Sequence, residues 1–324
     1  MSNIIALIWD FDKTLVDGYM QDPLFAEYGI DNKEFWKEVN ALPEKYEKEQ
    51  GVRVNKDSIY LNHILNYVKT GKFKSLNNEK LNNLGGEIKF YPGVLELFPA
   101  TIKMIEDNDI YKEFNIRLEH YIVSTGLSQM IWGSPLARYV DGIWGCDFIE
   151  SINHETQEKE LSEIVYTIDN TTKTRAIFEI NKGVGHRDGI EVNSKLSEEM
   201  RRVPFKNMIY IADGPSDIPA FSLINSKGGA TFAVYPHGNN EAFRQVESLR
   251  KDGRVQMYGE ANYSENTLTY LWLKNTILDI ADRIVAEEKA KLSPYVKPQP
   301  RHIENVRHTP CYTSFFQRIQ AKAR

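Results

Sequence analysis

Residues 4–14 read IIALIWDFDKT, and this stretch decides the fold class. Its first six residues form an unbroken apolar run, which is typical of a strand buried on both faces in a parallel sheet. The run ends in Asp10 and Asp12, two aspartates separated by one residue. Because ligands of open α/β sheets bind at the carboxyl ends of the strands, these carboxylates are the first candidate site residues.

Two later stretches repeat the pattern of an apolar run followed by polar residues. Residues 120–123 lead into Ser124 and Thr125, and residues 208–212 lead into Asp213. A shorter candidate strand and two helical patterns lie between and after these runs, at 231–234, 93–106 and 173–181. Strands that alternate with helices predict an α/β fold with a doubly wound, Rossmann-like parallel sheet.

A polar, helix-biased stretch interrupts this alternation after the first strand. Amphipathic helices are expected over 32–49 and 56–69, and Ser75 is expected to cap a further helix that stops at Gly85 and Gly86. We therefore expect an inserted helical cap. A second, smaller insertion is expected from about Leu127 to Asn170.

The C-terminal part has a different pattern. Residues 264–292 predict one long helix, with an apolar stripe at Leu268, Leu271, Leu278, Ala281 and Val285. The proline-containing stretch 293–324 predicts an extended tail docked by its aromatic residues. The expected organisation is an α/β core at 1–16 and 90–262, a helical cap at 17–89, and a C-terminal helix and extended tail at 263–324.

Composition excludes several classes of protein. With 41% hydrophobic and 26% charged residues, the chain can bury a core, and its net charge of −5 is unlike that of a nucleic-acid binder. Two cysteines, Cys146 and Cys311, are too few for a disulfide scaffold or a cysteine zinc cluster. No apolar run is long enough to span a bilayer, and the N-terminal run is too short for a signal peptide. We expect a cytoplasmic protein with neither a membrane nor a nucleic-acid partner.

The acidic residues at the strand ends suggest a metal site. Asp10 and Asp12 repel each other if they share one face, so such a pair needs a cation or a shared proton. Asp213, with Asp217 four residues later, brings further carboxylates to the same crevice, beside Ser124 and Thr125. A thiol-free cluster of oxygen ligands suits Mg²⁺, which binds through a few carboxylates, water and substrate phosphate.

Four motifs together resemble the haloacid dehalogenase superfamily, in its phosphatase branch near the phosphoserine phosphatase-like members. Residues 10–16 (DFDKTLV) resemble the nucleophile motif, and residues 121–126 (YIVSTG) the phosphate-binding serine or threonine motif. Lys173 fits the lysine of the third motif, with Lys182 as a rival, and residues 209–217 (IYIADGPSD) resemble the acidic fourth motif. The resemblance covers about 1–234 and leaves out the C-terminal helix and tail.

The resemblance implies a role for each of these residues. Asp10 would be the nucleophile and Asp12 the general acid and base. Mg²⁺ would be held by Asp10, the backbone carbonyl of Asp12 and Asp213, with Asp217 orienting the metal's water or hydrogen-bonding within the site. The phosphoryl oxygens would be held by the second motif (Ser124 and Thr125) and by Lys173. Carbon–halogen chemistry is disfavoured, because the dehalogenase branch lacks a carboxylate at the position of Asp12.

The sequence therefore predicts a Mg²⁺-dependent phosphomonoester phosphatase that acts on a small phosphorylated metabolite. A phosphotransferase or phosphomutase with the same nucleophile is the alternative within the enzymes, and a non-catalytic binding protein that keeps the fold is the alternative outside them. The C-terminal helix also leaves a homo-oligomer open as an expectation.

Overall fold

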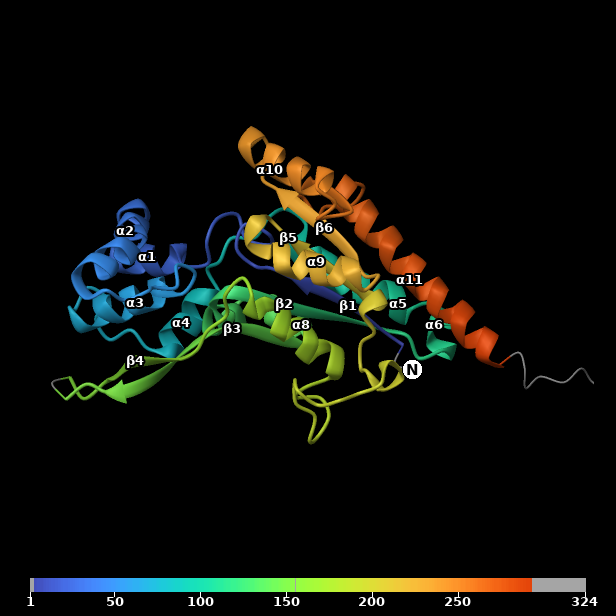
Figure 1. The fold of residues 1–324 in the computed structure, drawn as a ribbon, viewed down its shortest axis with the longest axis horizontal. Helices are drawn as coiled ribbons and strands as arrows, with labels where there is room; N and C mark the ends of the chain where they lie inside the picture. The colour runs from blue at the N-terminus through green and yellow to red at the C-terminus, as the bar shows by residue number, and fades with distance from the viewer. Residues whose placement is uncertain (1–2, 155, 293–324) are drawn as a thin grey trace, which may run out of the picture.

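The apolar run that opens the chain lies at the centre of a seven-stranded sheet. The computed structural model describes residues 3–154 and 156–292, and the strand order is β4-β3-β2-β1-β5-β6-β7 (Figure 1). Every residue of β1 is buried, and β1 pairs in parallel with β2 on one side and β5 on the other. The strands are β1 (Ile4–Trp9), β2 (Arg117–Leu127), β3 (Gly142–Ile152), β4 (Lys159–Tyr166), β5 (Met208–Ala212), β6 (Ala230–Tyr235) and β7 (Met257–Glu260).

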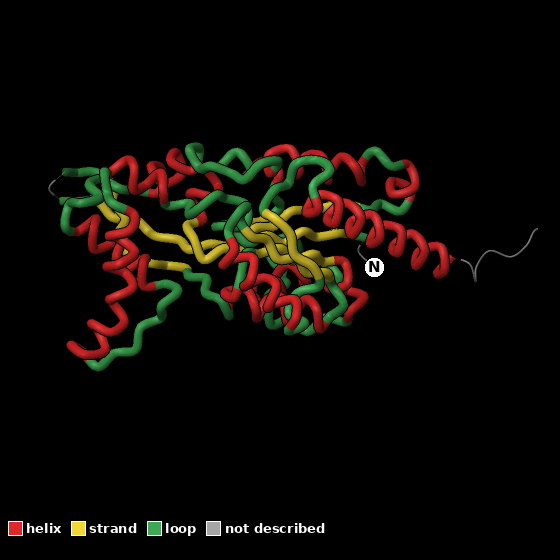
Figure 2. The backbone as a smooth tube through the Cα atoms, turned by 90° about the horizontal axis from the view of Figure 1, so that it is seen from above, coloured by secondary structure: helices red, strands yellow, loops and turns green. Residues whose placement is uncertain are grey.

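The expected doubly wound α/β fold is confirmed, because helices cover both faces of this mostly parallel sheet (Figure 2). Ile5, Leu7 and Trp9 of β1 face one core, while the alternate residues Ile4, Ala6 and Ile8 face the other. The first core is covered by α5 (Val94–Glu106), α6 (Asp109–Glu113) and α11 (Leu268–Leu292). The second is covered by α8 (Thr172–Lys182), α9 (Ile218–Ser226) and α10 (Asn240–Lys251).

Four helices occupy the segment between β1 and α5, where the sequence predicts an insertion. They are α1 (Asp22–Tyr28), α2 (Asn32–Gln50), α3 (Ile59–Lys69) and α4 (Asn78–Gly85). Figure 1 shows this helical unit to one side of the sheet, and we call it the cap. Buried aromatic rings form its centre, with the rings of Phe25 and Phe35 4.7 Å apart. The residue expected to cap the N-terminus of α4 was wrong. Asn77, not Ser75, accepts the hydrogen bond from the Lys80 backbone amide at 2.8 Å.

The segment expected to be a second insertion, Leu127 to Asn170, is a continuation of the sheet. It begins with α7 (Ser128–Gly133) and then forms β3, which pairs in parallel with β2, and β4, which pairs antiparallel with β3. The outer end of this hairpin reaches the cap, because the Leu161 amide donates to the Leu76 carbonyl at 2.9 Å. The prediction failed because β3 and β4 are half exposed and carry no continuous apolar run.

Four short 3₁₀ helices complete the fold. They are η1 (Ala137–Tyr139), η2 (Glu198–Met200), η3 (Phe205–Asn207) and η4 (Pro215–Asp217). The last of these follows directly after β5 and leads into α9.

The long C-terminal helix, α11, begins four residues later than expected, at Leu268. The predicted stripe is only partly correct, because Leu268 and Leu271 are exposed. The buried face consists of Leu273, Ile277, Ile280, Ala281, Ile284 and Val285. The tail 293–324 lies outside the described residues. None of the helices in residues 3–154 and 156–292 is both long and apolar enough to cross a membrane.

A buried histidine, His120, holds the last residue of β1 in place. The Trp9 indole N–H donates to Nδ1 of His120 on β2 at 3.0 Å, and the Thr101 hydroxyl lies 3.0 Å from the other ring nitrogen. His120 is fully buried, and burial lowers the pKa of its imidazole to about 3. The imidazole is therefore neutral at neutral pH, and it holds Trp9 immediately before Asp10.

Candidate active site

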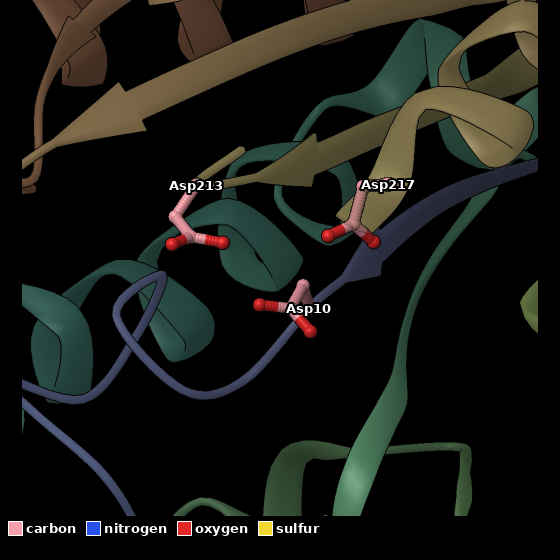
Figure 3. A group of neighbouring side chains, drawn as sticks. All are labelled: Asp10, Asp213 and Asp217. Atoms are coloured by element: carbon pink, nitrogen blue, oxygen red, sulfur yellow. The ribbon is translucent and has the colours of Figure 1, made fainter. Parts of the chain in front are cut away.

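Three carboxylates meet where β1 and β5 end, at the carboxyl edge of the sheet. Figure 3 shows the side chains of Asp10, Asp213 and Asp217 pointing toward one another, and one oxygen from each lies within 4.8 Å of the others. Asp10 follows the last residue of β1 and is tied to β5 by its amide, which donates to the Ile211 carbonyl at 2.9 Å. The sequence expectation that the strand-end aspartates converge is met by these three residues.

A buried lysine lies between two of these carboxylates. Lys173 Nζ donates to Asp10 Oδ1 at 2.7 Å and to Asp217 Oδ1 at 2.6 Å. Only 1% of the Lys173 side chain is exposed. Burial opposes its charge, but Asp10 and Asp217 together raise the pKa of its ammonium group above the usual value. Lys173 is thus a fixed cation inside the site.

The start of α8 sets the position of Lys173. Asp169, in the loop before the helix, accepts hydrogen bonds from the Thr171 and Thr172 amides at 2.9 and 2.7 Å. These bonds satisfy free amides at the helix N-terminus. The rival lysine, Lys182 at the other end of α8, donates instead to the backbone carbonyls of Val192 and Ser194. Of the two lysines, only Lys173 contacts the acidic cluster.

Asp217 is saturated by protein donors. Its Oδ1 accepts from the Tyr210 hydroxyl at 2.5 Å as well as from Lys173, and its Oδ2 accepts from the Ser216 hydroxyl at 2.9 Å. The side chain of Asp217 is fully buried. By contrast, no donor among the described residues hydrogen-bonds to the carboxylate of Asp213. Of these two aspartates, only Asp213 therefore has carboxylate oxygens that accept no hydrogen bond from the described residues and can bind a ligand.

The carboxylate of Asp12 lies outside the cluster of three. β1 ends at Trp9, so the chain has turned before residue 12, and Asp12 Oδ1 accepts from the Met20 amide at 2.7 Å. Burial, together with the neighbouring Asp10 and Asp213, raises the pKa of Asp12 to about 8. Asp12 is therefore mostly protonated at neutral pH in the absence of a bound cation.

The second predicted motif lies within β2 and not after it, because that strand continues to Leu127. Ser124 is buried, and its hydroxyl oxygen accepts from the Gly126 amide at 3.0 Å. Gly126 has no room for a side chain, since an added Cβ would lie 2.1 Å from the Met20 methyl group. The strand that carries Ser124 and Thr125 is thus packed directly against the segment that leads into the cap.

The charge of the site fits a divalent cation. Three carboxylates meet around the single buried ammonium group of Lys173, with the more exposed Lys13 as a further cation near Asp213, so full ionisation of the cluster leaves negative charge that the protein does not balance by contact. Burial and the neighbouring Asp10 raise the pKa of Asp213 to about 7, and burial raises the pKa of Asp10 as well. The possible ligands in this cluster are carboxylate oxygens, the kind of ligand that Mg²⁺ prefers. Asp10 and Asp213 are the residues whose carboxylates fit such an ion.

Sequence reasoning missed several contributors. Thr14 donates to Asp10 Oδ2 at 2.9 Å, although it stands within the quoted first stretch. Tyr210 could have been found, because a tyrosine in a fully buried strand needs a partner for its hydroxyl group. Nothing in the sequence indicates the contacts of Met20 or of Tyr60, whose hydroxyl donates to the Thr125 carbonyl at 2.7 Å.

Comparison with known proteins gives a clear relative. No protein-family model matches the chain. An uncharacterized protein of Borreliella burgdorferi is 40% identical over 287 residues, which cover 85% of this chain and 97% of that protein. The chain belongs to the same family as this Borreliella burgdorferi protein.

Among solved structures, the chain is similar to hydrolases. A HAD family hydrolase from Salmonella enterica serovar Typhi has a TM-score of 0.47 at 15% identity, covering 80% of this chain and 67% of that one. A phosphoserine phosphatase with an analogue of its phospho-aspartyl intermediate also has a TM-score of 0.47, at 17% identity, covering 85% and 99%. Because both TM-scores lie below 0.5, the activity has to be derived from the residues of this chain.

Proposed function

We propose that this protein is a Mg²⁺-dependent phosphomonoester phosphatase that becomes phosphorylated on Asp10. The observation that carries the proposal is the pair formed by Asp10 and the buried Lys173 at 2.7 Å, next to two further carboxylates. An ammonium group in this position holds Asp10 in one orientation and attracts the oxygens of an incoming phosphoryl group. If the Asp10–Lys173 pair served only to stabilise the fold, the neighbouring carboxylate of Asp213 would have no reason to lack a hydrogen-bond donor.

In the first half-reaction, an oxygen of the Asp10 carboxylate attacks phosphorus and the ester oxygen leaves. Thr14 and Lys173 fix the carboxylate from both oxygens, so the nucleophile is aimed before the substrate arrives. Lys173 and Ser124 are the groups that neutralise and hold the phosphoryl oxygens. Asp12 gives its proton to the leaving oxygen, and the burial that raises the pKa of its carboxyl favours the protonated form that this step needs.

In the second half-reaction, water attacks the phosphorylated Asp10. Asp12 is now ionised and can take the proton of that water, so one residue serves as acid and then as base. Asp10, Asp213 and the backbone carbonyl of Asp12 are the groups that would hold Mg²⁺. When bound, the cation offsets the repulsion between an anionic carboxylate and an anionic phosphate.

The cap favours a small phosphorylated metabolite as the substrate. The segment that leads into the cap contacts the core through the Met20 amide on Asp12, and α3 contacts it through the Tyr60 hydroxyl on the Thr125 carbonyl. A cover anchored at these two points restricts access by large polymers and limits water during the reaction. The domain limits of the cap, the absence of nucleic-acid and membrane partners, and a homo-oligomer formed through the C-terminal helix stay predictions.

The test is release of p-nitrophenol and of inorganic phosphate from p-nitrophenyl phosphate, with Mg²⁺ and with a chelator. We expect Mg²⁺-dependent release of both products by the natural sequence. We expect at most about 1% of that rate for Asp10→Asn, a loss of about 3 kcal/mol or more in transition-state stabilisation. No release by the natural sequence would favour the non-catalytic alternative. Release of p-nitrophenol without an equal amount of inorganic phosphate, in the presence of an acceptor alcohol, would favour a phosphotransferase.

A further inference from the structure

Three aromatic side chains of the cap and its leading segment form a continuous arc. The ring centroids of Tyr19 and Trp36 are 5.3 Å apart, and those of Trp36 and Tyr60 are 5.8 Å apart. Tyr19 and Trp36 are only partly buried, whereas Phe25 and Phe35 behind them are almost completely buried. Tyr60 is 4% exposed and belongs to the core, so Tyr19 and Trp36 are the members of the arc that keep an accessible surface.

Both ends of this arc are fixed to the reacting part of the core. Tyr19 precedes Met20, whose amide donates to Asp12 Oδ1 at 2.7 Å. At the other end, the hydroxyl of Tyr60 donates to the Thr125 carbonyl at 2.7 Å. Asp12 follows β1 and Thr125 lies on the neighbouring strand β2. The arc thus connects the segment that follows β1 with the last part of β2, beside the residues proposed to bind the phosphate.

Two buried polar atoms, one in the arc and one in the segment that follows Tyr19, lack a partner. Among the described residues, five buried side-chain atoms have no hydrogen bond, and two of them are Trp36 Nε1 and Gln21 Oε1. Gln21 is 2% exposed and follows Met20 directly. A buried donor or acceptor without a partner costs about 1–3 kcal/mol, so such atoms call for a ligand or water. One is a donor and the other an acceptor, as an uncharged polar ring requires.

A cation lies over the Tyr19 end of the arc. Lys13 Nζ lies 4.4 Å from the centroid of the Tyr19 ring. The backbone of Lys13 has a φ of 58°, in the left-handed region that disfavours residues other than glycine. Strain of this kind persists where the surroundings require it and is common at ligand sites. Lys13 brings a positive charge to the place where the arc approaches the phosphate.

We propose that Tyr19 and Trp36, supported by the buried Tyr60, bind a planar, polar ring in the leaving group of the substrate. The indole N–H of Trp36 donates to an acceptor on that ring, and Gln21 Oε1 accepts from a donor. The substrate class is a phosphomonoester of a nitrogen- and oxygen-bearing ring compound, such as a nucleoside monophosphate or a phosphorylated pyridine. This inference rests on the proposed phosphatase activity and adds the part of the substrate that the cap selects.

The experiment compares four esters on the Mg²⁺-loaded protein: a nucleoside 5′-monophosphate, pyridoxal 5′-phosphate, phenyl phosphate and glycerol 3-phosphate. The first two esters distinguish a nucleobase from a pyridine as the polar ring. Phenyl phosphate has a ring without polar atoms, and glycerol 3-phosphate has no ring. We expect kcat/KM for at least one polar-ring ester to exceed that for glycerol 3-phosphate by about tenfold or more. Both are esters of primary alcohols, so their chemical reactivity is similar.

Two substitutions separate the ring from its N–H group. Trp36→Leu should reduce the preference for ring esters over glycerol 3-phosphate by about fivefold or more, because the stacking surface is lost. Trp36→Phe should reduce kcat/KM for the polar-ring ester by about two- to tenfold and leave phenyl phosphate within about twofold, because only a hydrogen bond is lost. Tyr19→Leu tests the other end of the arc in the same way. Trp132→Leu, at a tryptophan that is 46% exposed on α7, is the matched control and should change no ratio.

Ratios of esters on one variant do not depend on the fraction of folded protein, so a destabilised variant still gives an answer. If the natural sequence hydrolyses glycerol 3-phosphate as well as the ring esters, or if the arc variants leave the ratios unchanged, the ring site is refuted while the phosphatase stands. If none of the four esters nor p-nitrophenyl phosphate is hydrolysed, the proposed function itself fails, and the ring site fails with it.

Discussion

Replacing Lys173 by methionine tests the centre of the site, because it removes the charge and keeps most of the volume. Lys173 is 1% exposed, and the side chains of its partners Asp10 and Asp217 are 8% and 0% exposed. Removing one partner of a buried ion pair costs about 3–5 kcal/mol, since the remaining charge is left without compensation. We expect a loss of this size in the free energy of unfolding near neutral pH, measured by urea denaturation with chelator present.

The pH dependence of this loss is a second check on its cause. Burial raises the pKa of Asp10, and Lys173 is the group that lowers it. Without the lysine, the folded-state pKa of Asp10 rises further above its unfolded value, so the variant is stabilised by protonation and loses stability as the pH increases. The difference between natural and Lys173→Met protein should therefore shrink when the pH is lowered from about 7.5 to about 5.

A matched control lies on the same helix. Lys182→Met removes a lysine of α8 whose Nζ donates to backbone carbonyls of Val192 and Ser194 and contacts no carboxylate. This variant should keep phosphatase activity and lose about 1 kcal/mol of stability, while Lys173→Met should lose at least about a hundredfold in kcat. If both variants behave alike, or if Lys173→Met stays within about 1 kcal/mol and tenfold of the natural protein, Lys173 is not the fixed cation of the site.

Three further outcomes are expected. The Asp12→Asn variant should accumulate protein phosphorylated on Asp10 when p-nitrophenyl phosphate is the substrate. This leaving group needs little protonation, but the attack of water loses its general base, which contributes about 10²–10⁴-fold to the rate. Rapid-quench mass spectrometry detects the phosphorylated protein. Asp213→Asn should weaken Mg²⁺ binding in calorimetric titration more than Asp217→Asn does, since protein donors already occupy both Asp217 oxygens. The folded-state pKa of His120, about 3, lies below its unfolded value, so its contribution to the free energy of unfolding is fully present above about pH 6.5 and falls by up to ~1.4 kcal/mol per pH unit as the pH decreases. Urea midpoints of His120→Gln should depend less on pH.

The strands predicted correctly are those that a single physical rule identifies. β1 and β5 are buried at every position, so their sequences are apolar without interruption. β3 and β4 lie toward one edge of the sheet and extend beyond it to the cap, and their alternating and exposed residues resemble those of a loop. β7 has only four residues and includes a glycine. Edge strands are stabilised by pairing with neighbours already present, and that information is not local in the sequence.

The residues of the candidate site were likewise predictable only where a local sequence pattern marks them. The positions of Asp10 and Asp213 were predictable, because they end the two central strands and parallel strands end at one edge. The choice of Lys173 over Lys182 was not, since both lysines lie on one helix and only the packing of α8 decides which end faces the site. The amide of Met20 on Asp12 depends on how the cap segment returns to the core, which no local pattern indicates.

The two aspartates of the last motif show why spacing alone leaves their roles open. Asp213 and Asp217 are four residues apart and both reach the cluster, so the sequence treats them as equivalent acids. The 3₁₀ turn of η4 carries Asp217 under the Tyr210 hydroxyl and onto Lys173, where every oxygen already accepts a hydrogen bond. Asp213 receives no such donor in the described part of the chain, and burial with Asp10 nearby raises its pKa to about 7. A carboxylate that the protein leaves uncompensated gains most from a bound cation, whereas one that is fully paired serves to hold the lysine. Of these two aspartates, the asymmetry of donors therefore favours Asp213 as a ligand of the proposed cation, while Asp217 contacts Lys173.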